Sequence, residues 1–332
     1  MAAPQIVVEA LTKRYRVAER DPGISGALRG LFSRRYRTVE ALKAVSFSLE
    51  AGELLGFIGP NGAGKSTAIK ILSGILRPTS GAVRVDGLVP WEDRIRHVAR
   101  IGVVFGQRTQ LWWDLPMGEG FDLLRDIYRV DPARYARTRD ELVALLGLEA
   151  LLGQPVRQLS LGQRMRAEIV ATLLHEPRIL FLDEPTIGLD APAKLAVRAF
   201  VERLNRERGV TVLLTTHDMH DIEALAERVI VIGNGVVLAD TPFETLRAGS
   251  LAERRLVVDF AGSAPALELE GVQVVAREGQ RLELAFDPAR MSAPALIARI
   301  AASHAVEDIH VEQPAIEAVI ASFYRRHGAA EG

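Results

Sequence analysis

Residues 59–67 read Gly-Pro-Asn-Gly-Ala-Gly-Lys-Ser-Thr and fit the pattern G-x-x-x-x-G-K-[ST]. An apolar run over residues 54–58 precedes them, and residues 69–72 follow with helical spacing. In this strand–loop–helix order, backbone N–H groups and a helix N-terminus can cradle phosphates. Lys65 is placed to reach the β- and γ-phosphates, and the Ser66 hydroxyl to join the shell of a bound Mg²⁺. The stretch predicts a nucleoside triphosphate site with contacts from Gly59, Pro60, Asn61, Gly62, Ala63, Gly64, Lys65, Ser66 and Thr67.

The composition of the chain sets broad bounds on its function. With 332 residues, 48% hydrophobic and 25% charged, it has the make-up of a globular protein and room for two domains. The net charge of −1 gives no case for nucleic-acid binding, and the absence of cysteine excludes disulfides and thiolate metal sites. No run approaches the ~20 apolar residues that span a bilayer. We therefore expect any membrane role to come through a partner.

The order of apolar runs predicts an α/β domain followed by a smaller one. Up to about residue 245, β-branched runs alternate with longer helical patterns, which favours a largely parallel sheet. Residues 117–158 read as mostly helical and predict a helical subdomain at about 108–175. After about residue 250 the pattern changes to short strands with helices, which predicts a small α+β domain. The predicted domains are 1–248 and 249–332.

Individual strands and helices follow from the same runs. The strands predicted in the first domain are Gln5–Glu9, Leu54–Ile58, Ile101–Phe105, Ile179–Leu182, Thr211–Thr215 and Val229–Ile232, with a hairpin turn at 233–235. Those predicted in the second are Arg255–Phe260, Gln273–Arg277, Arg281–Phe286 and Asp308–Glu312, with helices at Ala293–Ser303 and Ala315–Tyr324.

Four further strings follow the phosphate loop in order. They are Leu-Ser-Leu-Gly-Gln at 159–163, Arg-Ile-Leu-Phe-Leu-Asp-Glu-Pro at 178–185, Gly-Leu-Asp at 188–190 and Thr-Thr-His-Asp at 215–218. In this order and spacing, the chain resembles the ATP-binding cassette (ABC) family, the nucleotide-hydrolysing subunits of ABC transporters, over roughly residues 5–245. The resemblance implies a P-loop ATPase domain with a mixed sheet core, an antiparallel β subdomain and a helical subdomain. It also implies ATP and Mg²⁺ as ligands.

The resemblance assigns roles to residues after the predicted strands. Asp183 would hold Mg²⁺ directly or through water, and Glu184 would be the general base for the attacking water. His217 would contact the γ-phosphate and orient that water. Gln107 would contact Mg²⁺ and the water, although Gly106 adds one residue before it, and Gln110 is the weaker alternative.

The string at 159–163 implies a second subunit. In the family, this segment faces the γ-phosphate held by an opposing subunit through a hydroxyl, N–H groups and a helix N-terminus. Leu161 stands where glycine is typical, so a side chain must fit there; we interpret it as a tolerated variant. The expected partner is another ABC ATPase subunit, in a homodimer or a heterodimer. The nucleotide contacts predicted on this side are Ser160, Gly162, Gln163 and Asp190.

Adenine usually stacks on an aromatic ring near the first strand in this family. Tyr15 fits the local K-x-Y pattern, whereas Tyr36 fits the linear distance to the phosphate loop. We choose Tyr15 because stacking needs a position held by the sheet. Between them lies an insertion at about 17–38, whose apolar spacing and arginines predict a basic amphipathic helix over residues 21–37. Such a helix either lies against an anionic membrane or partner helix or packs on its own domain.

Longer phrases resemble ATPases paired with ABC type-2 permeases, including antibiotic-resistance and viologen exporters. These phrases are FGQRTQLWWDLP at 105–116, DEPTIGLD at 183–190 and EQPAIEAVIASFY at 312–324. They imply the ATPase subunit of an exporter, held at the cytoplasmic face of the cell membrane by type-2 permease subunits, with Trp112 and Trp113 where the permease's coupling helix docks. The alternative is a soluble, non-transport ABC ATPase of the translation or repair type. Those proteins usually carry two cassettes or long coiled coils, and neither is present here.

Overall fold

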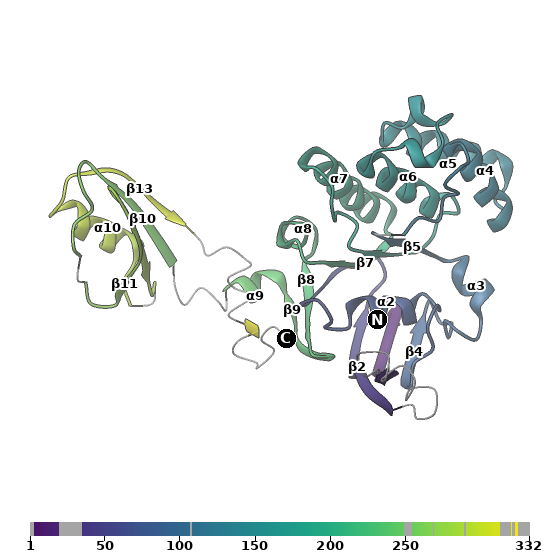
Figure 1. The fold of residues 1–332 in the computed structure, drawn as a ribbon, viewed down its shortest axis with the longest axis horizontal. Helices are drawn as coiled ribbons and strands as arrows, with labels where there is room; N and C mark the ends of the chain where they lie inside the picture. Colours follow the sequence, from purple (N-terminus) through teal and green to yellow (C-terminus); the bar gives the residue numbers. More distant parts are fainter. Residues whose placement is uncertain are drawn as a thin grey trace, which may run out of the picture. The chain divides into compact units, whose positions relative to one another are not determined.

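The computed structural model describes residues 3–19, 35–106, 108–248, 254–267, 269–288, 290–312, 320 and 323–324. The chain separates into two compact units, Met1–Asp240 and Thr241–Gly332 (Figure 1). The predicted domain bounds, 1–248 and 249–332, stay predictions, because compactness alone does not show where an independently folding domain ends. Each unit is described by itself.

A six-stranded sheet forms the centre of the first unit, in the order β5-β6-β7-β3-β8-β9. Neighbours among its first five strands pair in parallel, and β3 and β6 are buried along their whole length. Such continuous apolar runs are typical of parallel strands covered on both faces. The strands are β3 (Leu54–Ile58), β5 (Ile101–Phe105), β6 (Ile179–Asp183), β7 (Thr211–Thr216), β8 (Arg228–Gly233) and β9 (Val236–Pro242). Five of the six segments predicted as strands in this unit fall in this sheet, and the sixth, Gln5–Glu9, overlaps β1 (Ile6–Glu19) of a second sheet, except for Gln5.

An antiparallel sheet in the order β2-β1-β4 lies in the same unit. Its strands are β1 (Ile6–Glu19), β2 (Arg35–Leu49) and β4 (Ser80–Val85). Neither β2 nor β4 was predicted from the apolar runs of the sequence. In β2, Ala44 takes a φ of 51° and the register with β1 shifts nearby, which breaks the alternation that marks a strand.

The predicted basic helix lies mostly outside the described residues, since 20–34 are not among them. For its last residues, 35–37, the prediction was wrong. They belong to β2 and pair with residues 17–19 of β1. The ladder between the two strands therefore satisfies these backbone groups, and they have no need of helical hydrogen bonds.

Helices cover the six-stranded sheet and form a group of their own. Within 108–175, α4, α5 and α6 contact one another and gather at one end of the unit in Figure 1. The bounds are α2 (Lys65–Leu72), α3 (Arg94–Val98), α4 (Met117–Tyr128), α5 (Pro132–Leu145), α6 (Leu161–Leu173), α7 (Ala191–Arg208) and α8 (Met219–Leu225), with short 3₁₀ turns η1 (Glu149–Leu151) and η2 (Val156–Gln158). None of the helices among the described residues has the length and apolar character to cross a membrane.

The second unit is a small α+β structure. Its antiparallel sheet has the order β11-β12-β10-β13, and α10 packs on one face through Leu296 and Ile300. The elements are α9 (Phe243–Ala248), β10 (Arg254–Phe260), β11 (Val272–Glu278), β12 (Arg281–Phe286), α10 (Ala293–Ala301) and β13 (Val306–Glu312). The predicted closing helix, Ala315–Tyr324, lies almost wholly outside the described residues.

Candidate functional site

The glycine-rich loop connects β3 to α2 and curls around the ammonium of Lys65. Lys65 Nζ donates to the carbonyl oxygens of Gly59 at 2.6 Å and Pro60 at 3.2 Å. Gly64 takes a φ of 109°, and a Cβ there would lie 2.5 Å from the carbonyl oxygen of Ala41, so only glycine fits. Helix α2 starts without a side-chain cap, which leaves its first-turn N–H groups for an external acceptor.

Burial and two nearby carboxylates shift the pKa of Lys65 in opposite directions. Burial lowers the pKa of its ammonium from the ordinary 10.5, while Glu184 and Asp183 raise it. An ammonium carries three donors, and two of them are held by the loop carbonyls. The loop therefore presents a partly desolvated cation and unpaired N–H groups, which suits polyphosphate.

Asp183 ends β6 and brings oxygen atoms from three segments together. Its Oδ1 accepts hydrogen bonds from Ser66 Oγ at 3.1 Å and from Thr215 Oγ1 at 2.6 Å. Carboxylate and hydroxyl oxygens are ligands that Mg²⁺ prefers. Among the described residues, no group of three or more His, Cys, Asp or Glu side chains could hold a metal by itself. The donor set fits Mg²⁺, because this ion is commonly bound by one or two carboxylates together with substrate phosphates.

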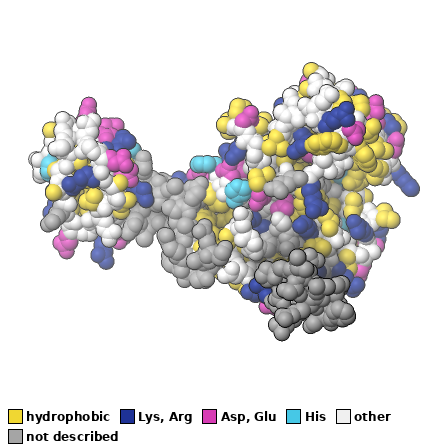
Figure 2. Space-filling model, viewed as in Figure 1, with side chains coloured by type: hydrophobic (Ala, Val, Ile, Leu, Met, Phe, Trp, Pro, Cys, Tyr) yellow, Lys and Arg dark blue, Asp and Glu magenta, His cyan; other side chains and the backbone are white. Residues whose placement is uncertain are grey.

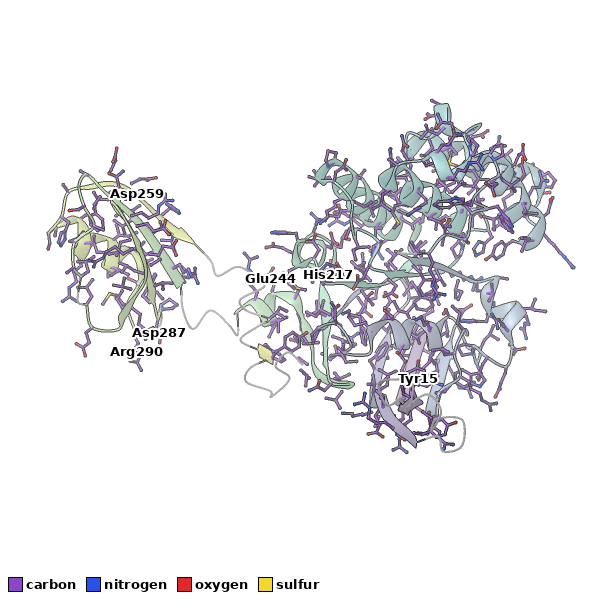
Figure 3. The ribbon with its side chains drawn as sticks, in the orientation of Figure 1. Tyr15, His217, Glu244, Asp259, Asp287 and Arg290 are labelled. Atoms are coloured by element: carbon purple, nitrogen blue, oxygen red, sulfur yellow. The ribbon has the colours of Figure 1, made fainter. Side chains whose placement is uncertain are left out.

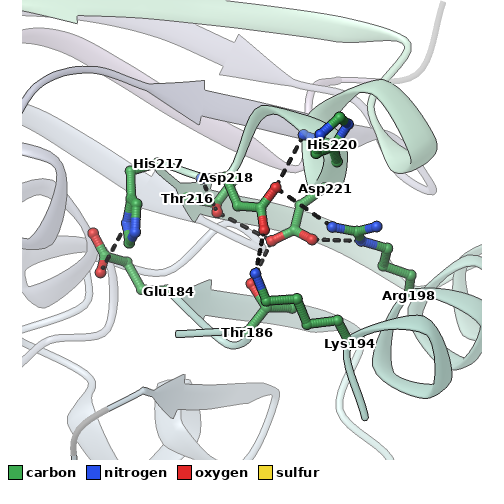
Figure 4. Close-up of polar contacts among 9 residues, drawn as sticks. All are labelled: Glu184, Thr186, Lys194, Arg198, Thr216, His217, Asp218, His220 and Asp221. Carbon is green, nitrogen blue, oxygen red and sulfur yellow. Dashed lines mark hydrogen bonds and ion pairs between the residues drawn. The ribbon is translucent and has the colours of Figure 1, made fainter. Parts of the chain in front are cut away.

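Glu184 and His217 face each other across the ends of neighbouring strands (Figure 4). His217 Nδ1 lies 3.4 Å from Glu184 Oε2. Glu184 takes a φ of 56°, and its N–H donates to the Thr215 carbonyl at 2.9 Å. A non-glycine residue at φ > 0 is uncommon and costs free energy, so this turn holds the carboxylate in a specific place.

The segment before the predicted glutamine packs closely on this turn. A Cβ on Gly106 would clash with the carbonyl oxygen of Glu184, so the extra residue noticed in the sequence must be a glycine. Gln107 itself lies outside the described residues. The alternative, Gln110, donates its amide to Thr172 Oγ1 at 2.6 Å and is thus engaged with α6.

The second set of predicted contacts gathers at the starts of α6 and α7. Ser160 caps α6 in a reciprocal box with Gln163, and Asp190 caps α7 by accepting the N–H of Ala193 at 2.9 Å. A pocket of about 370 Å³ is lined by Ser160, Leu161, Gly162 and Gln163 on one side and by Gly188, Asp190, Pro192, Ala193 and Ala196 on the other, with Arg166. Among the described residues that line it, none comes from 59–67.

Leu161 packs against the segment before α7. Its Cδ2 lies 2.9 Å from the position that a Cβ on Gly188 would take. Gly188 also has a φ of 71°. The side chain that replaces the usual glycine is therefore accommodated by a glycine opposite, and the start of α6 keeps its cap.

The two candidate adenine-stacking tyrosines lie on the long β1–β2 ribbon. Tyr15 pairs with Val39 and is half-buried, with Lys13 Nζ 5.3 Å from its ring centroid (Figure 3). Tyr36 is 46% exposed, and the Arg16 guanidinium lies 4.9 Å from its ring centroid. Both residues have their backbone in the strand ladder. The choice of Tyr15 stays a prediction.

Sequence reasoning missed several residues that hold this site. Thr215 was quoted in the strand 211–215 and in the string at 215–218 but was given no role, although a polar residue at the end of a buried strand is the signal that could have found it. Thr186, Arg198 and Asp221 interact although they are far apart in the chain. Their spacing carries no motif, so only the structure reveals them.

Comparisons with known proteins show which family this chain resembles. The ABC transporter family matches residues 42–187. The chain is 33% identical to the daunorubicin resistance ATP-binding protein DrrA3 of Streptomyces coeruleorubidus, covering 86% of this chain and 92% of that protein. It is 32% identical to the methionine import ATP-binding protein MetN of Latilactobacillus sakei subsp. sakei (strain 23K), covering 80% of each. It is also similar to the ATP-binding cassette MJ0796, solved as a dimer in a post-hydrolysis state with ADP and Pi, at 28% identity and a TM-score of 0.60 over 71% of this chain and 98% of that one.

The fold, the phosphate loop and the Asp183–Glu184 strand end together define an ATP-binding cassette ATPase. The resemblance recognised in the sequence is thereby confirmed. The chain belongs to the ABC transporter family as an ATP-binding subunit that hydrolyses ATP.

Proposed function

We propose that this ATPase works as a dimer that holds each ATP between the phosphate loop of one subunit and the Ser160 segment of the other, and that it drives an exporter permease. The observation that carries this proposal is the separation of the predicted contacts into two sets. Residues 59–67, Asp183, Glu184 and His217 form one set, and the pocket at Ser160 forms another without them. The solved relative that is a dimer supports a composite site.

In the first set, the contacts of Lys65, Ser66 and Asp183 support the roles proposed for them. Lys65 keeps a donor for the β- and γ-phosphates, and the N–H groups at the start of α2 donate to the same anion. Ser66 and Asp183, with Gln107, would hold Mg²⁺. When bound, this ion neutralises charge on the phosphate oxygens. Tyr15 would stack on the adenine.

Glu184 and His217 would act on the water. Glu184 accepts a proton from the attacking water, since its carboxylate is fixed at the end of β6. His217, 3.4 Å from that carboxylate, orients the water and contacts the γ-phosphate. In the second set, Ser160, Gly162, Gln163 and Asp190 would meet the γ-phosphate of the partner's ATP through the capped ends of α6 and α7.

The permease would dock beside the helical group. Trp112 and Trp113 are 42% and 48% exposed, and Arg164 of α6 lies over the Trp113 ring at 5.3 Å. Figure 2 shows yellow hydrophobic and dark blue basic side chains together over the α4–α6 region. Exposed aromatic and arginine side chains are typical anchors at protein interfaces. This surface supports a place at the cytoplasmic face of the cell membrane, bound to permease subunits.

We propose that the transport direction is export. The similarity to a daunorubicin resistance protein over most of both chains supports it, together with the sequence phrases at 105–116 and 183–190. The similarity to a methionine import protein also covers most of both chains. The type of permease therefore decides the direction, and we propose an ABC type-2 permease.

Replacing Glu184 by glutamine tests the composite site. In E184Q we expect ATP to bind normally, hydrolysis to fall by about 100-fold or more, and a dimer to accumulate with ATP because the base is removed while the binding groups stay. Hydrolysis is measured by phosphate release, and the dimer by light scattering after gel filtration. E207Q, on the exposed surface of α7, is the matched control and should behave as the wild type. Undiminished hydrolysis in E184Q would remove the base role, and a strictly monomeric E184Q with ATP would contradict the dimer.

A further inference from the structure

Asp221 on α8 is a carboxylate at the centre of a buried network that the proposed function does not use (Figure 4). It is fully buried. Its Oδ1 accepts from Arg198 Nε at 2.5 Å, and its Oδ2 accepts from Thr216 Oγ1 at 3.1 Å and from Thr186 Oγ1. A buried carboxylate is costly unless it is paired and hydrogen-bonded, so these donors fix its place.

The donors come from segments next to the groups that act on water. Thr186 lies two residues after Glu184, in the turn that follows β6. Thr216 ends β7 and directly precedes His217. One carboxylate oxygen therefore joins the turn that carries Glu184 to the strand end that carries His217.

The third donor attaches both segments to α7. Arg198 bonds Asp221 and lies 3.5 Å from Asp218, and Lys194, one turn earlier on α7, donates to Asp218 at 2.5 Å. The N–H of Asp218 in turn donates to Thr216 Oγ1 at 2.9 Å. The two bonds from charged donors, Lys194 to Asp218 and Arg198 to Asp221, are the short ones, at 2.5 Å each.

Helix α7 also borders the second set of predicted contacts. Ala193 and Ala196 line the pocket with Ser160 and Gly162, whereas Lys194 and Arg198 on the same two turns hold the residues around His217. Residues three and four apart share a face of a helix, and the intervening ones point elsewhere. One rigid helix thus contacts the Ser160 pocket on one side and the Asp221 network on another.

We infer that Asp221 is a positioning residue, which fixes the Glu184 turn and the His217 strand end relative to each other and to α7. The inference rests on the proposed roles of Glu184 and His217 in hydrolysis. Asp221 touches neither ATP nor water in this account. It keeps His217 Nδ1 3.4 Å from Glu184 Oε2. Because α7 also lines the Ser160 pocket, a displacement of α7 at that pocket would change this distance.

Asp221→Asn is the direct test, because it preserves shape but replaces one acceptor oxygen by an amide donor. We expect kcat to fall about 10-fold while KM for ATP changes less than about twofold, since only the alignment of the reacting groups is disturbed. Rates are normalised to bound nucleotide, so that loss of folded protein does not count. T186V, which removes one donor without stranding a buried charge, should lower kcat about threefold. E223Q on the same helix is the matched control and should behave as the wild type.

Hydrogen–deuterium exchange provides a readout that does not need hydrolysis. In D221N, peptides covering residues 184–188 and 214–218 should exchange at least about fivefold faster, while those covering 54–72 stay unchanged, because only the Asp221 contacts are lost. Unchanged kcat in D221N overturns the inference and leaves the proposed function standing. A wild type as inactive as E184Q overturns the proposed function instead, and exchange in D221N then decides whether Asp221 holds the two segments. Equal exchange in D221N and the wild type overturns the inference in either case.

Discussion

His217 Nδ1 lies 3.4 Å from Oε2 of Glu184, and the two side chains come from the ends of different strands, β7 and β6. The backbone of Glu184 takes a φ of 56°, and this conformation sets the direction of its side chain. The position of His217 is set by the end of β7 before it, where Thr216 donates a hydrogen bond to Asp221. The pair lies next to Asp183, whose carboxylate bonds Ser66 of the phosphate loop. A carboxylate base and an imidazole at this spacing can hold one water between them and the γ-phosphate.

His217→Ala should lower kcat by about 100-fold or more, because the water loses one of its two orienting groups. ATP affinity should change little, since the phosphate loop is intact. His220→Ala is the control: His220 is exposed and lies 3.9 Å from Glu223 rather than at the site. Steady-state phosphate release with a fluorescent nucleotide titration separates the two effects. An H217A variant that keeps wild-type turnover would show that the approach to Glu184 has no catalytic role.

Gly106→Ala should damage hydrolysis although Gly106 carries no functional group. A Cβ there clashes with the carbonyl oxygen of Glu184 and pushes the Glu184 turn away. A misplacement of this kind costs about 10-fold or more in kcat. Gly153→Ala is the matched control, because a Cβ at that position meets no atom within 4 Å. Equal rates for both variants would mean that the Glu184 turn tolerates displacement.

Ser160→Ala should weaken the ATP-dependent dimer. Loss of the cap alone costs α6 about 1 kcal/mol, and loss of the hydroxyl removes a predicted contact to the partner's ATP. Ser292→Ala separates these effects, because Ser292 caps α10 in the second unit by the same kind of bond. Both variants should lose similar stability in urea unfolding of their own units, but only S160A should lower the dimer fraction. A dimer fraction that S160A and S292A lower alike would contradict the role of Ser160.

Acid pH should destabilise the fold through His175. Burial lowers the pKa of this imidazole to about 4 from the ordinary 6.5, although its hydrogen bond to the Ile101 carbonyl raises it. Below pH 6.5 His175 is protonated in the unfolded chain, whereas in the folded chain it is protonated only below about pH 4. The free energy of unfolding is therefore not reduced by His175 above about pH 6.5, and it decreases as the pH falls, by about 2 kcal/mol at pH 5. Urea unfolding at pH 7 and pH 5 measures it.

The matched variants for this prediction are His175→Gln and His220→Gln. H175Q removes the titrating group but keeps a donor for the Ile101 carbonyl, so its stability should depend less on pH than that of the wild type. H220Q changes an exposed histidine and should keep the wild-type dependence. The same pH dependence in H175Q and the wild type would show that another group dominates.

The sequence was informative where the physics is local. Buried strands such as Leu54–Ile58 and Ile179–Asp183 are continuous apolar runs, and the loop at 59–67 has a fixed order of glycines. Strand β2 was missed because the bulge at Ala44 breaks its alternation, and residues 35–37 were read as helix although they pair with β1. The contacts of Asp221 and of Gly106 join segments distant in the chain. No local pattern encodes them, since they arise only when strands and helices pack.

In the proposed dimer, one ATP site is built from two chains. Lys65→Ala disables the phosphate loop, and Ser160→Ala weakens the opposite side, so each variant alone should hydrolyse ATP slowly. In a mixed dimer, the intact loop of the S160A chain meets the intact Ser160 segment of the K65A chain. Phosphate release by an equal mixture should therefore exceed the mean of the two separate variants by about threefold or more. A mixture that hydrolyses ATP only at that mean would show that each site lies within one chain.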